Sequence, residues 1–250
     1  MSSTALKHFF PHPSSSHHAR MSHSSPPKSE RQEYIDKLQN KFNSMEACRS
    51  HIRQKGYPMM LNDAVKHNTM VGDGRLKDVV NLWSDVLARG VAGDWVETGT
   101  YKGGTSMLAA MLVRAAADHP SCPRIHRTIW LADSFEGLPA KRAEDAGKDK
   151  GGLQMDPAGS YSGYGGVAYV RSQFSRQSFR IRGAATISAN TRANPVIRFL
   201  PGWFNATIPS APIDKIALLR LDGDMCERCP PPPRLAACPQ HLAAAHVTRC

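Results

Sequence analysis

The sequence predicts an α/β protein with a Rossmann-like parallel sheet that is covered by helices on both faces. Four short apolar runs bounded by turn-forming residues have the length of buried strands: residues 94–98, 128–133, 196–200 and 216–221. Stretches with helical periodicity lie before and between these runs. Apolar strands that alternate with helices are typical of a parallel sheet between two helical layers. Several of the runs end in glycine or an acidic residue, and ligands of such sheets bind at that edge.

Three helices are expected. The first covers residues 29–42, where apolar residues recur every four positions. The second covers residues 76–88, whose apolar side chains form one broad face. The third covers residues 105–117, which are rich in Ala, Leu and Met and begin with Thr105 as the expected cap. Residues 67–74 are predicted to form a loop between the first two helices.

The chain divides by composition into three parts. Residues 1–29 are rich in Ser, His and Pro and hold too little apolar surface to fold, so they form either a disordered arm or an organelle transit peptide. Residues 30–225 contain the predicted helices and strands and form the expected domain. Residues 226–250 are an irregular tail rich in Pro and Cys. Within the domain, the long polar stretch 141–166 is expected to be a substrate loop or lid.

Charge and cysteine content narrow the classes of function. The net charge of +11 would suit binding to nucleic acid. The basic residues are scattered and no nucleic-acid-binding motif accompanies them, which argues against nucleic-acid binding as the main role. No apolar run approaches the ~20 residues of a membrane span, so no transmembrane segment is expected. Four of the six cysteines lie in the last 25 residues, away from the globular part. We therefore expect a reduced compartment, cytoplasmic or organellar, and no disulfide framework.

The first candidate site is the segment ETGTYKGGT, residues 97–105, between the first strand and the helix that follows it. Its glycines, Gly99, Gly103 and Gly104, let the backbone approach a ligand closely, and a helix N-terminus offers N–H groups. The spacing matches neither the dinucleotide fingerprint nor a P-loop. The carboxylate of Glu97 suits a ligand with an ammonium or sulfonium charge and would repel a pyrophosphate. The alternative interpretation is a tight turn with no ligand.

Two further strand ends carry acidic residues. Asp133, followed by Ser134, is placed to accept the ribose hydroxyls of a nucleoside, although an acid there also serves as a helix cap. Asp222 and Asp224 follow the last predicted strand, and paired carboxylates bind a divalent ion such as Mg²⁺. An ordinary turn at the end of a strand is the alternative.

Four segments within residues 67–225 resemble the macrocin-type O-methyltransferases, which methylate sugar hydroxyls of macrolide antibiotics: HNTMVGDGRL, GDWVETGTYKGGTS, IWLADSFEGLP and RFLPGWFNATIPSAPIDKIALLRLDGDM. The resemblance implies a class I methyltransferase fold. It also implies S-adenosylmethionine as the methyl donor, a Mg²⁺-assisted active site and a small-molecule acceptor with a hydroxyl group.

The resemblance also implies roles for the glycine-rich segment, which would hold the methionyl part of the cofactor. Its residues expected to bind are Glu97, Gly99, Tyr101, Gly103, Gly104 and Thr105. Thr69 and Met70 would belong to a segment that closes over the cofactor.

The remaining site residues follow the other strands. By the same resemblance, Asp133 would bind the ribose with Ser134 beside it, and Trp203 would border the adenine. Asp222 corresponds to the first metal-binding carboxylate of the family and is the expected catalytic residue.

The sequence departs from the family pattern after Met225, where the family has a long helix and a strand that ends in a second pair of aspartates. Four consecutive prolines, Pro230 to Pro233, cannot form that helix. We therefore expect the last strands to be missing and strand 216–221 to be an exposed edge that promotes self-association. A basic insertion at residues 175–195 is the second departure.

The tail offers one competing site. Cys226 and Cys229, followed by His241 and His246, come close to zinc-finger spacing, but the segment between them lacks the apolar core of a finger. Three functions therefore stay open. The leading one is an O-methyltransferase, the second is a non-catalytic S-adenosylmethionine-binding protein, and the third is a nucleic-acid-binding protein with a zinc tail.

Overall fold

The computed structural model describes residues 28–137, 166–181, 194–222 and 245–247. Two compact units divide the chain, residues 1–39 and 40–250. Helix α1 (Lys28–Met60) begins in the first unit, where its described side chains are exposed, and its remainder belongs to the second. No helix in the described part of the chain is both long and apolar enough to cross a membrane. The second unit contains the sheet and the candidate site.

A single parallel sheet forms the centre of the second unit. Its strands are β1 (Asp94–Thr98), β2 (Thr128–Asp133), β3 (Arg180–Ile181), β4 (Val196–Pro201), β5 (Ile216–Leu221) and β6 (Ala245–Val247). They lie in the order β3-β4-β2-β1-β5-β6, and every neighbouring pair is parallel. The strand order therefore reverses direction between β1 and β5. The predicted α/β fold with a parallel sheet is confirmed.

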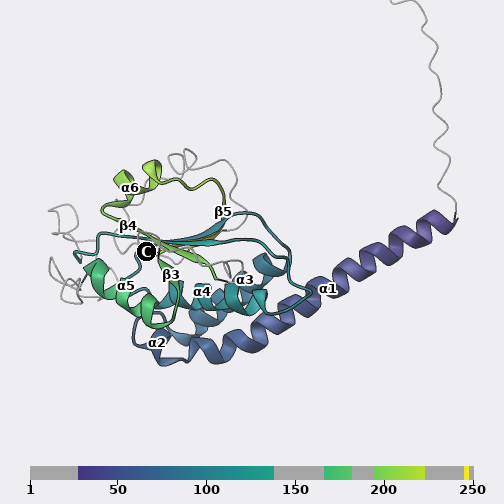
Figure 1. Cartoon of the computed structure of the whole chain (residues 1–250), viewed down its shortest axis with the longest axis horizontal. Coiled ribbons are helices and arrows are strands. Elements are labelled where there is room, and N and C mark those ends of the chain that lie inside the picture. The colour runs from purple at the N-terminus through teal and green to yellow at the C-terminus, as the bar shows by residue number, and fades with distance from the viewer. Residues whose placement is uncertain (1–27, 138–165, 182–193, 223–244, 248–250) are drawn as a thin grey trace, which may run out of the picture. The chain divides into compact units, whose positions relative to one another are not determined.

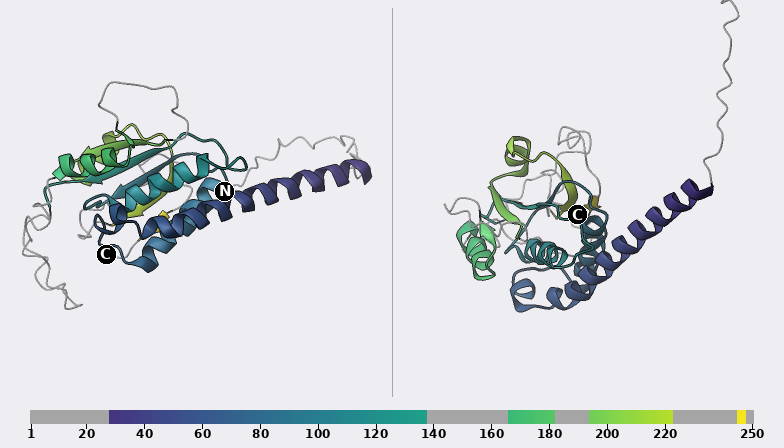
Figure 2. Two further views of the ribbon diagram at one scale, coloured as in Figure 1. Left: turned by 60° about the horizontal axis from the view of Figure 1, so that its bottom comes forward. Right: turned by 45° about the vertical axis from the view of Figure 1, so that its right-hand side comes forward.

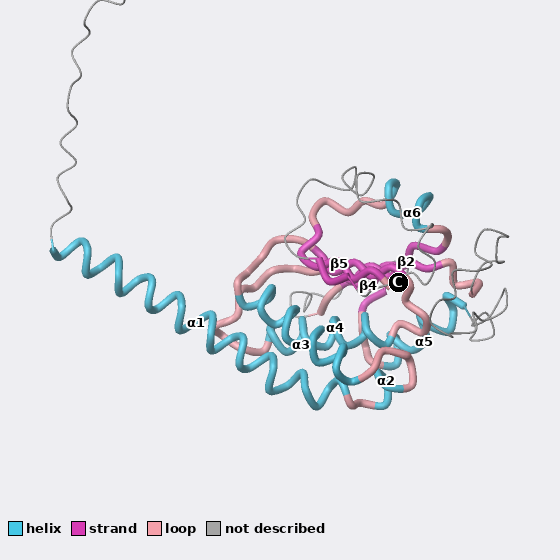
Figure 3. Tube along the Cα trace, turned by 180° about the vertical axis from the view of Figure 1, so that it is seen from behind, coloured by secondary structure: helices cyan, strands magenta, loops and turns pink. Residues whose placement is uncertain are grey.

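Helices cover both faces of this sheet. Besides α1, the described helices are α2 (Asp63–Lys66), α3 (Asp73–Ala88), α4 (Gly104–Ala117), α5 (Gly166–Arg176) and α6 (Phe204–Ser210). Helices α3, α4 and α5 lie on one side of the sheet and α6 lies on the other (Figures 1 and 3). Figure 2 shows the same layering from two further directions.

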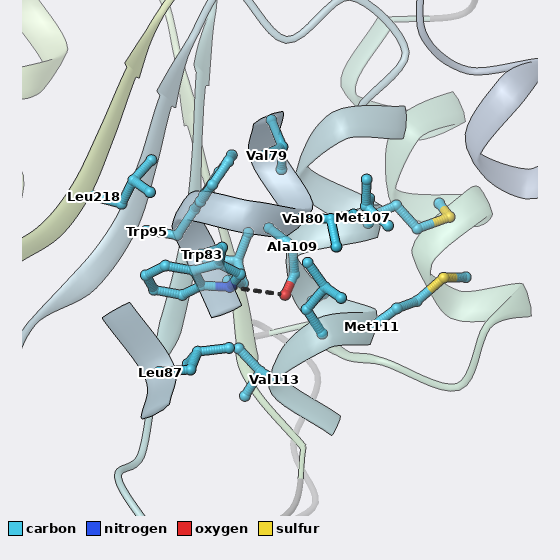
Figure 4. Packing of buried hydrophobic residues seen from close by; sticks show 14 of the residues in the cluster. Val79, Val80, Trp83, Leu87, Trp95, Met107, Ala109, Met111, Val113 and Leu218 are labelled. Atoms are coloured by element: carbon cyan, nitrogen blue, oxygen red, sulfur yellow. Dashed lines mark hydrogen bonds between the residues drawn. The ribbon is translucent and has the colours of Figure 1, made fainter. Parts of the chain in front are cut away.

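The main core lies between the sheet and helices α3 and α4 (Figure 4). Trp83 of α3 is fully buried and donates from Nε1 to the carbonyl oxygen of Ala109 at 3.1 Å, so its polar atom is satisfied inside the core. Its ring meets Trp95 of β1 edge-on, with 5.6 Å between the ring centroids. The alternate residues of the strands, such as Val96 and Trp130, form a smaller cluster on the face of α6.

Helix α4 begins one residue earlier than predicted, and its cap differs from the prediction. The N-cap residue is Gly103, in the left-handed conformation with φ of 82°, and no side chain caps the helix. Thr105 lies inside the first turn and is buried. The prediction that Thr105 is the cap was wrong, because the left-handed turn that enters the helix needs a glycine at the cap position.

The edge of the sheet beyond β5 also differs from the expectation. Strand β6 pairs in parallel with β5 over Leu219 to Leu221, so half of β5 is covered on that side. Residues 245–247 lie after the proline-rich segment and contain no proline, so they retain the N–H groups that pairing requires. The expectation of a fully exposed edge was therefore wrong for these three residues.

The cysteines do contribute to the globular part, contrary to the expectation from sequence. Cys48 of α1 and Cys122, in the loop between α4 and β2, form a disulfide with 5.0 Å between their Cα atoms. The two residues are 74 positions apart in the chain, so no spacing pattern in the sequence marks them as a pair.

The helices extend beyond the sequence-based expectation. Helix α1 continues to Met60 instead of ending near residue 42, and α2, α5 and α6 form where no helix was predicted. The N-terminal arm, most of the polar stretch 141–166, residues 182–193 of the basic insertion and most of the tail lie outside the described residues.

Candidate functional site

The carboxyl ends of four strands meet at one edge of the sheet. Three backbone hydrogen bonds extend the pairing just beyond the strands. The N–H of Gly99 donates to Ala132 at 3.0 Å, that of Gly202 to Asp133 at 2.9 Å, and that of Asp222 to Thr98 at 2.9 Å. This edge includes the point between β1 and β5 where the strand order reverses, which is where open α/β sheets bind their ligands.

The glycine-rich loop after β1 has an unusual backbone. Gly99, Tyr101 and Gly103 have φ values of 75°, 52° and 82°. Positive φ is uncommon for a residue with a Cβ atom such as Tyr101, and such backbone strain is often found at ligand sites. The N–H of Gly103 donates to the carbonyl oxygen of Thr100 at 2.8 Å and closes the loop.

Asp133 organises this loop from the end of β2. Its Oδ2 accepts hydrogen bonds from the backbone N–H groups of Thr100 at 2.7 Å and Tyr101 at 3.2 Å. Its Oδ1 accepts the N–H of Phe135 at 2.9 Å. A carboxylate at the end of one strand therefore fixes two loops of the edge at once.

Ser134 shapes the turn that follows β2. Its hydroxyl donates to the carbonyl oxygen of Gly137 at 3.0 Å and accepts the N–H of Glu136 at 3.2 Å. Phe135 within this turn has a positive φ of 56°. The predicted neighbours Asp133 and Ser134 therefore hold the turn that borders the glycine-rich loop.

Glu97 lies beneath the edge in a buried ionic network. It stands opposite Arg220 in the parallel register of β1 and β5, and Nη1 of Arg220 donates to its Oε1 at 2.5 Å. Both side chains are 1% exposed. The hydroxyl of Ser106 donates to Oε2 of Glu97, and Nη2 of Arg220 donates to Oδ2 of Asp222. We call Glu97, Arg220 and Asp222 the ionic triad.

Burial sets the protonation of this triad. It raises the pKa of Glu97 from 4.5 to about 7, although the charge of Arg220 and the hydrogen bond from Ser106 act in the opposite direction. Burial alone would lower the pKa of Arg220, but the two carboxylates outweigh it and raise that pKa. Arg220 therefore stays protonated, and Glu97 exchanges its proton near neutral pH.

Gly103 and Gly104 pack against the protein itself. A Cβ atom on Gly103 would lie 2.8 Å from Val170 of α5. A Cβ atom on Gly104 would lie 2.5 Å from the carbonyl oxygen of Val65 and 2.6 Å from the carbonyl carbon of Asn68. Both glycines are therefore required for close packing at the start of α4, whether or not a ligand approaches them.

The segment between α2 and α3 lies on this helix start. The N–H of Gly104 donates to the carbonyl oxygen of Asn68 at 2.8 Å, and the hydroxyls of Thr69 and Thr105 are 3.0 Å apart. Met70, next in the chain, is 56% exposed. The structure therefore brings Thr69 to the glycine-rich loop, as the expected site requires, and leaves the Met70 side chain at the surface.

Trp203 lies at the same edge of the sheet. It is the N-cap residue of α6 and directly follows Gly202, whose N–H donates to the backbone carbonyl oxygen of Asp133. Its side chain is 41% exposed, which is unusual for a tryptophan in a folded domain. Together with Met70, it provides exposed apolar surface among the predicted site residues.

Comparison with known proteins identifies the family. The profile of the macrocin O-methyltransferase (TylF) family matches residues 14–229. The chain belongs to this family. It is 35% identical over 179 residues to demethyldecarbamoylnovobiocin O-methyltransferase from Streptomyces niveus, covering 72% of this chain and 59% of that enzyme.

Two further proteins are similar to this chain. 8-Demethyl-8-(2,3-dimethoxy-alpha-L-rhamnosyl)-tetracenomycin-C 4'-O-methyltransferase from Streptomyces olivaceus is 36% identical over 160 residues, covering 64% of this chain and 53% of that enzyme. The solved structure of the O-methyltransferase NovP is 34% identical, with a TM-score of 0.44, and the match covers 64% of this chain and 58% of NovP. The chain thus spans between 53% and 59% of the length of the two curated relatives.

The metal ligands expected from the macrocin O-methyltransferase family are not assembled among the described residues. The described residues contain no group of three or more carboxylates, histidines and cysteines that could hold a metal ion. Asp224, the second carboxylate predicted beside Asp222, lies outside the described residues. Oδ2 of Asp222 instead pairs with the guanidinium of Arg220, whose positive charge opposes a divalent cation. The donor set described at this edge therefore does not fit Mg²⁺.

Sequence reasoning missed Arg220, the central residue of the ionic triad. It lies within the apolar run 216–221, which was read only as a buried strand. A single arginine in such a run needs a buried counter-charge, and Glu97 occupies the matching place on the other strand of the switch point. The isolated charge was the signal that could have revealed the pair.

A second contact that sequence reasoning missed joins α5 to the site. The hydroxyl of Tyr169 donates to Oδ1 of Asn68 at 3.1 Å, and the side-chain amide of Asn68 donates to the carbonyl oxygen of Ala64 at 2.8 Å. Asn68 is 3% exposed. These bonds hold the segment that contains Thr69 in place.

Proposed function

We propose that the chain binds S-adenosylmethionine at the carboxyl edge of its sheet and belongs to an O-methyltransferase acting on a hydroxyl of a sugar or secondary metabolite. The observation that carries the proposal is Asp133, which fixes the strained glycine-rich loop and its own turn beside the switch point. The family of the chain and the names of its relatives support the same reaction class.

The hydrogen-bonding capacity of Asp133 supports a nucleoside ligand. Each carboxylate oxygen accepts about two hydrogen bonds. Two backbone N–H groups occupy Oδ2, whereas Oδ1 receives one bond of 2.9 Å and a longer contact of 3.5 Å from the hydroxyl of Ser134. Among the described residues, Oδ1 thus retains capacity for one ribose hydroxyl.

The charge of the ionic triad supports a cationic ligand. Two carboxylates and one guanidinium leave one net negative charge when Glu97 is ionised. Because Glu97 is buried, we propose that it positions Arg220 and Asp222 and does not itself contact the methionyl ammonium group. Asp222, whose side chain is 29% exposed, is the member of the triad that is accessible at the edge.

S-Adenosylmethionine, when bound, supplies a methyl group made electrophilic by its sulfonium charge. The residues of this chain would hold that methyl group in line with the acceptor oxygen, so that the carbon–oxygen bond forms as the carbon–sulfur bond breaks. S-Adenosylhomocysteine would leave, and the proton of the acceptor hydroxyl would pass to water. The Asp133-bound loop orients the nucleoside, and the segment around Thr69 restricts access from the start of α4. We derive no step through Mg²⁺, because the described donors do not fit it.

A non-catalytic S-adenosylmethionine-binding protein is the second candidate. The ion pair between Asp222 and Arg220 favours it, because the guanidinium occupies Oδ2 of the expected metal-binding carboxylate. In either case we propose that the partner is a small-molecule acceptor or ligand. We also propose that the chain self-associates through the part of the β5 edge that β6 leaves uncovered.

We propose a cytoplasmic or organellar location. Fusing residues 1–29 to a fluorescent protein and observing where the fusion accumulates tests which of the two it is.

Calorimetric titration of the full chain with S-adenosylmethionine tests the proposal. We expect binding in the wild type and a loss of affinity of about tenfold or more in Asp133→Ala. The control Asp78→Ala removes an exposed carboxylate of α3 and leaves the affinity unchanged. No binding in the wild type, or equal affinity in Asp133→Ala, refutes the proposed site.

A methyl-transfer assay then separates the two candidates. The chain is incubated with labelled S-adenosylmethionine and a panel of glycosides that carry free hydroxyl groups, with Mg²⁺ and with a chelator. Transfer of label to an acceptor supports the enzyme, and binding without transfer to any acceptor supports the non-catalytic protein.

A further inference from the structure

Two cysteines and two histidines gather at the end of α4 that lies away from the candidate site. Cys48 and Cys122 form the disulfide described above. The rings of His51 and His119 are in contact, with 4.6 Å between their centroids and an angle of 35° between their planes. Helix α4 separates this group, which we call the Cys/His cluster, from the glycine-rich loop by 14 residues, or about 21 Å along the helix. The cluster is therefore distinct from the proposed methyl-transfer site.

The cluster is built from two matching short-range pairs. Cys48 and His51 are three residues apart on α1, so they are neighbours on one face of that helix. His119 and Cys122 are also three residues apart and close a turn, in which the N–H of Cys122 donates to the carbonyl oxygen of His119 at 3.1 Å. When the two segments meet, cysteine faces cysteine and histidine faces histidine.

The polar atoms of this cluster are poorly satisfied. Nε2 of His51 is buried and has no hydrogen-bond partner among the described residues. Nδ1 of His119 accepts only a long bond from the N–H of Ser121, at 3.3 Å. Cys48 and Cys122 are 0% and 4% exposed. A buried imidazole nitrogen without a partner is unfavourable, and binding a metal ion would satisfy it.

We propose that Cys48, His51, His119 and Cys122 form a tetrahedral zinc site when the disulfide is reduced. A thiol or dithiol reductant supplies two electrons, so the sulfur–sulfur bond breaks and two thiols form. Zn²⁺ then binds both sulfurs, which release their two protons to water, together with one nitrogen of each neutral imidazole. Two sulfur and two nitrogen ligands are one of the sets that hold zinc in closed structural sites.

The movement that this change requires is small. With zinc–sulfur bonds of about 2.3 Å at tetrahedral angles, the two sulfurs separate to about 3.8 Å, a change that side-chain rotation can provide. Zinc would take Nδ1 of His119 in place of the long bond from Ser121. In the disulfide form the sulfurs are bonded to each other, and the described residues then contain no group of three metal ligands.

Other contacts keep the two segments together after reduction. The hydroxyl of Ser44 on α1 donates to the carbonyl oxygen of Ser121 at 3.3 Å, so a second link joins the helix to the same loop. Arg49, next to Cys48, pairs with Asp85 of α3 at 2.5 Å. The four ligands therefore stay close to one another when the covalent bond is broken.

Cobalt binding to the full chain tests this site. The four tail cysteines are replaced by serine, so that Cys48 and Cys122 are the only thiols. After reduction with a phosphine, we expect one Co²⁺ per chain, with thiolate-to-cobalt charge-transfer absorption and the strong visible bands of tetrahedral cobalt, and displacement by one equivalent of Zn²⁺. The oxidised chain, whose fold is intact, should show none of these bands.

Single histidine variants decide whether the imidazoles are ligands. We expect His51→Ala and His119→Ala each to weaken Co²⁺ binding about tenfold or more. The control His126→Ala removes an exposed histidine of the same loop and should leave binding unchanged. Circular dichroism and free-thiol titration show that each variant is folded and reduced. The proposal is overturned if the reduced, folded chain binds no Co²⁺, or if both histidine variants keep the cobalt affinity and spectrum of the parent chain.

Discussion

Arg220 stands opposite Glu97 across the β1–β5 pair, and its guanidinium donates to the Glu97 carboxylate at 2.5 Å while both side chains are 1% exposed. The two strands that they join are those between which the strand order reverses. Because water does not reach either group, each charge depends on the other for its compensation. The ion pair therefore couples the stability of the sheet to the geometry of the candidate site.

Replacing Arg220 by methionine is expected to destabilise the fold strongly. The change keeps an unbranched side chain but leaves the Glu97 carboxylate buried without a cation, which costs about 3–5 kcal/mol in comparable pairs. The free energy of unfolding, measured by urea denaturation at pH 8, gives this cost. The double variant Glu97→Met with Arg220→Met should be more stable than the single variant, because it has no fully buried charge without a partner. Asp222 also loses Arg220 in both variants, but its side chain is 29% exposed and reaches water.

The matched control for Arg220→Met is Arg89→Met. Arg89 forms a surface ion pair with Asp85 at 3.3 Å, and its side chain is 58% exposed. Solvent screens such a pair, so the expected cost is about 0–1 kcal/mol. Equal losses in the two variants would contradict the special role of the buried pair.

The buried carboxylate also predicts a pH dependence of stability. The pKa of Glu97 rises from 4.5 to about 7 on folding, so the folded state binds a proton more tightly than the unfolded state. The stabilisation from this group is complete below about pH 4.5 and is lost as the pH rises to about 7. The free energy of unfolding of the wild type, minus that of Glu97→Gln, should therefore fall over this range and stay level above it. A difference that rises with pH would show that the carboxylate is already ionised in the fold at low pH.

The sheet could be predicted from sequence because its signal is local. The strands β1, β2 and β5 have the predicted bounds, since each is a short apolar run between turn-forming residues. The partner of Glu97 could not be predicted in this way, because Arg220 is 123 positions away in the chain. The disulfide between Cys48 and Cys122 was missed for the same reason.

The glycines show a different limit of sequence reasoning. The sequence assigns Gly103 and Gly104 to cofactor binding. In the structure, however, α5 and the segment before α3 pack so closely against these two residues that a Cβ atom would not fit at either position. Close approach of a ligand and close approach of another part of the chain both demand glycine, so the residue type cannot separate them. Helix α5 was missed because its buried residues, Val170 and Phe174, are two apolar positions at the end of a long polar stretch.

Substituting alanine for Gly104 is expected to destabilise the domain and to weaken binding of S-adenosylmethionine. The new Cβ atom would lie 2.5 Å from the carbonyl oxygen of Val65, so the segment that holds Asn68 and Thr69 must move. Overpacking of this kind costs about 1–3 kcal/mol. Chemical denaturation measures the loss, and calorimetry measures the affinity for the cofactor.

Gly74→Ala provides the control for that substitution. Gly74 lies in the first turn of α3, and a Cβ atom there meets nothing within 4 Å. Alanine restricts the unfolded chain and favours the helix, so we expect unchanged or slightly higher stability, by up to about 1 kcal/mol. If Gly104→Ala behaves like Gly74→Ala, close packing does not explain the glycine at the start of α4.

Asp133→Asn separates the two roles of the carboxylate, which are to order the glycine-rich loop and to bind the nucleoside. In the wild type both oxygens accept backbone N–H groups, Oδ2 from Thr100 and Tyr101 and Oδ1 from Phe135. Asparagine has a single acceptor oxygen, so its NH₂ group must face one of these donors. An unsatisfied backbone N–H group destabilises the folded state by about 1–3 kcal/mol. We expect this loss to appear as easier local opening of the loops at the sheet edge, because these hydrogen bonds hold the loops in place.

Hydrogen exchange read at individual amides measures this local effect. In Asp133→Asn, the amides of Thr100 and Tyr101 should exchange faster, or that of Phe135 should if the NH₂ group takes the other position, while the buried amides of α3 keep their protection. Affinity for S-adenosylmethionine should fall in parallel with the lost protection, because the ordered loop is what positions the ligand. If all three amides keep their protection while the affinity falls, Asp133 contacts the nucleoside without organising the loop, and the strained backbone after β1 needs another cause.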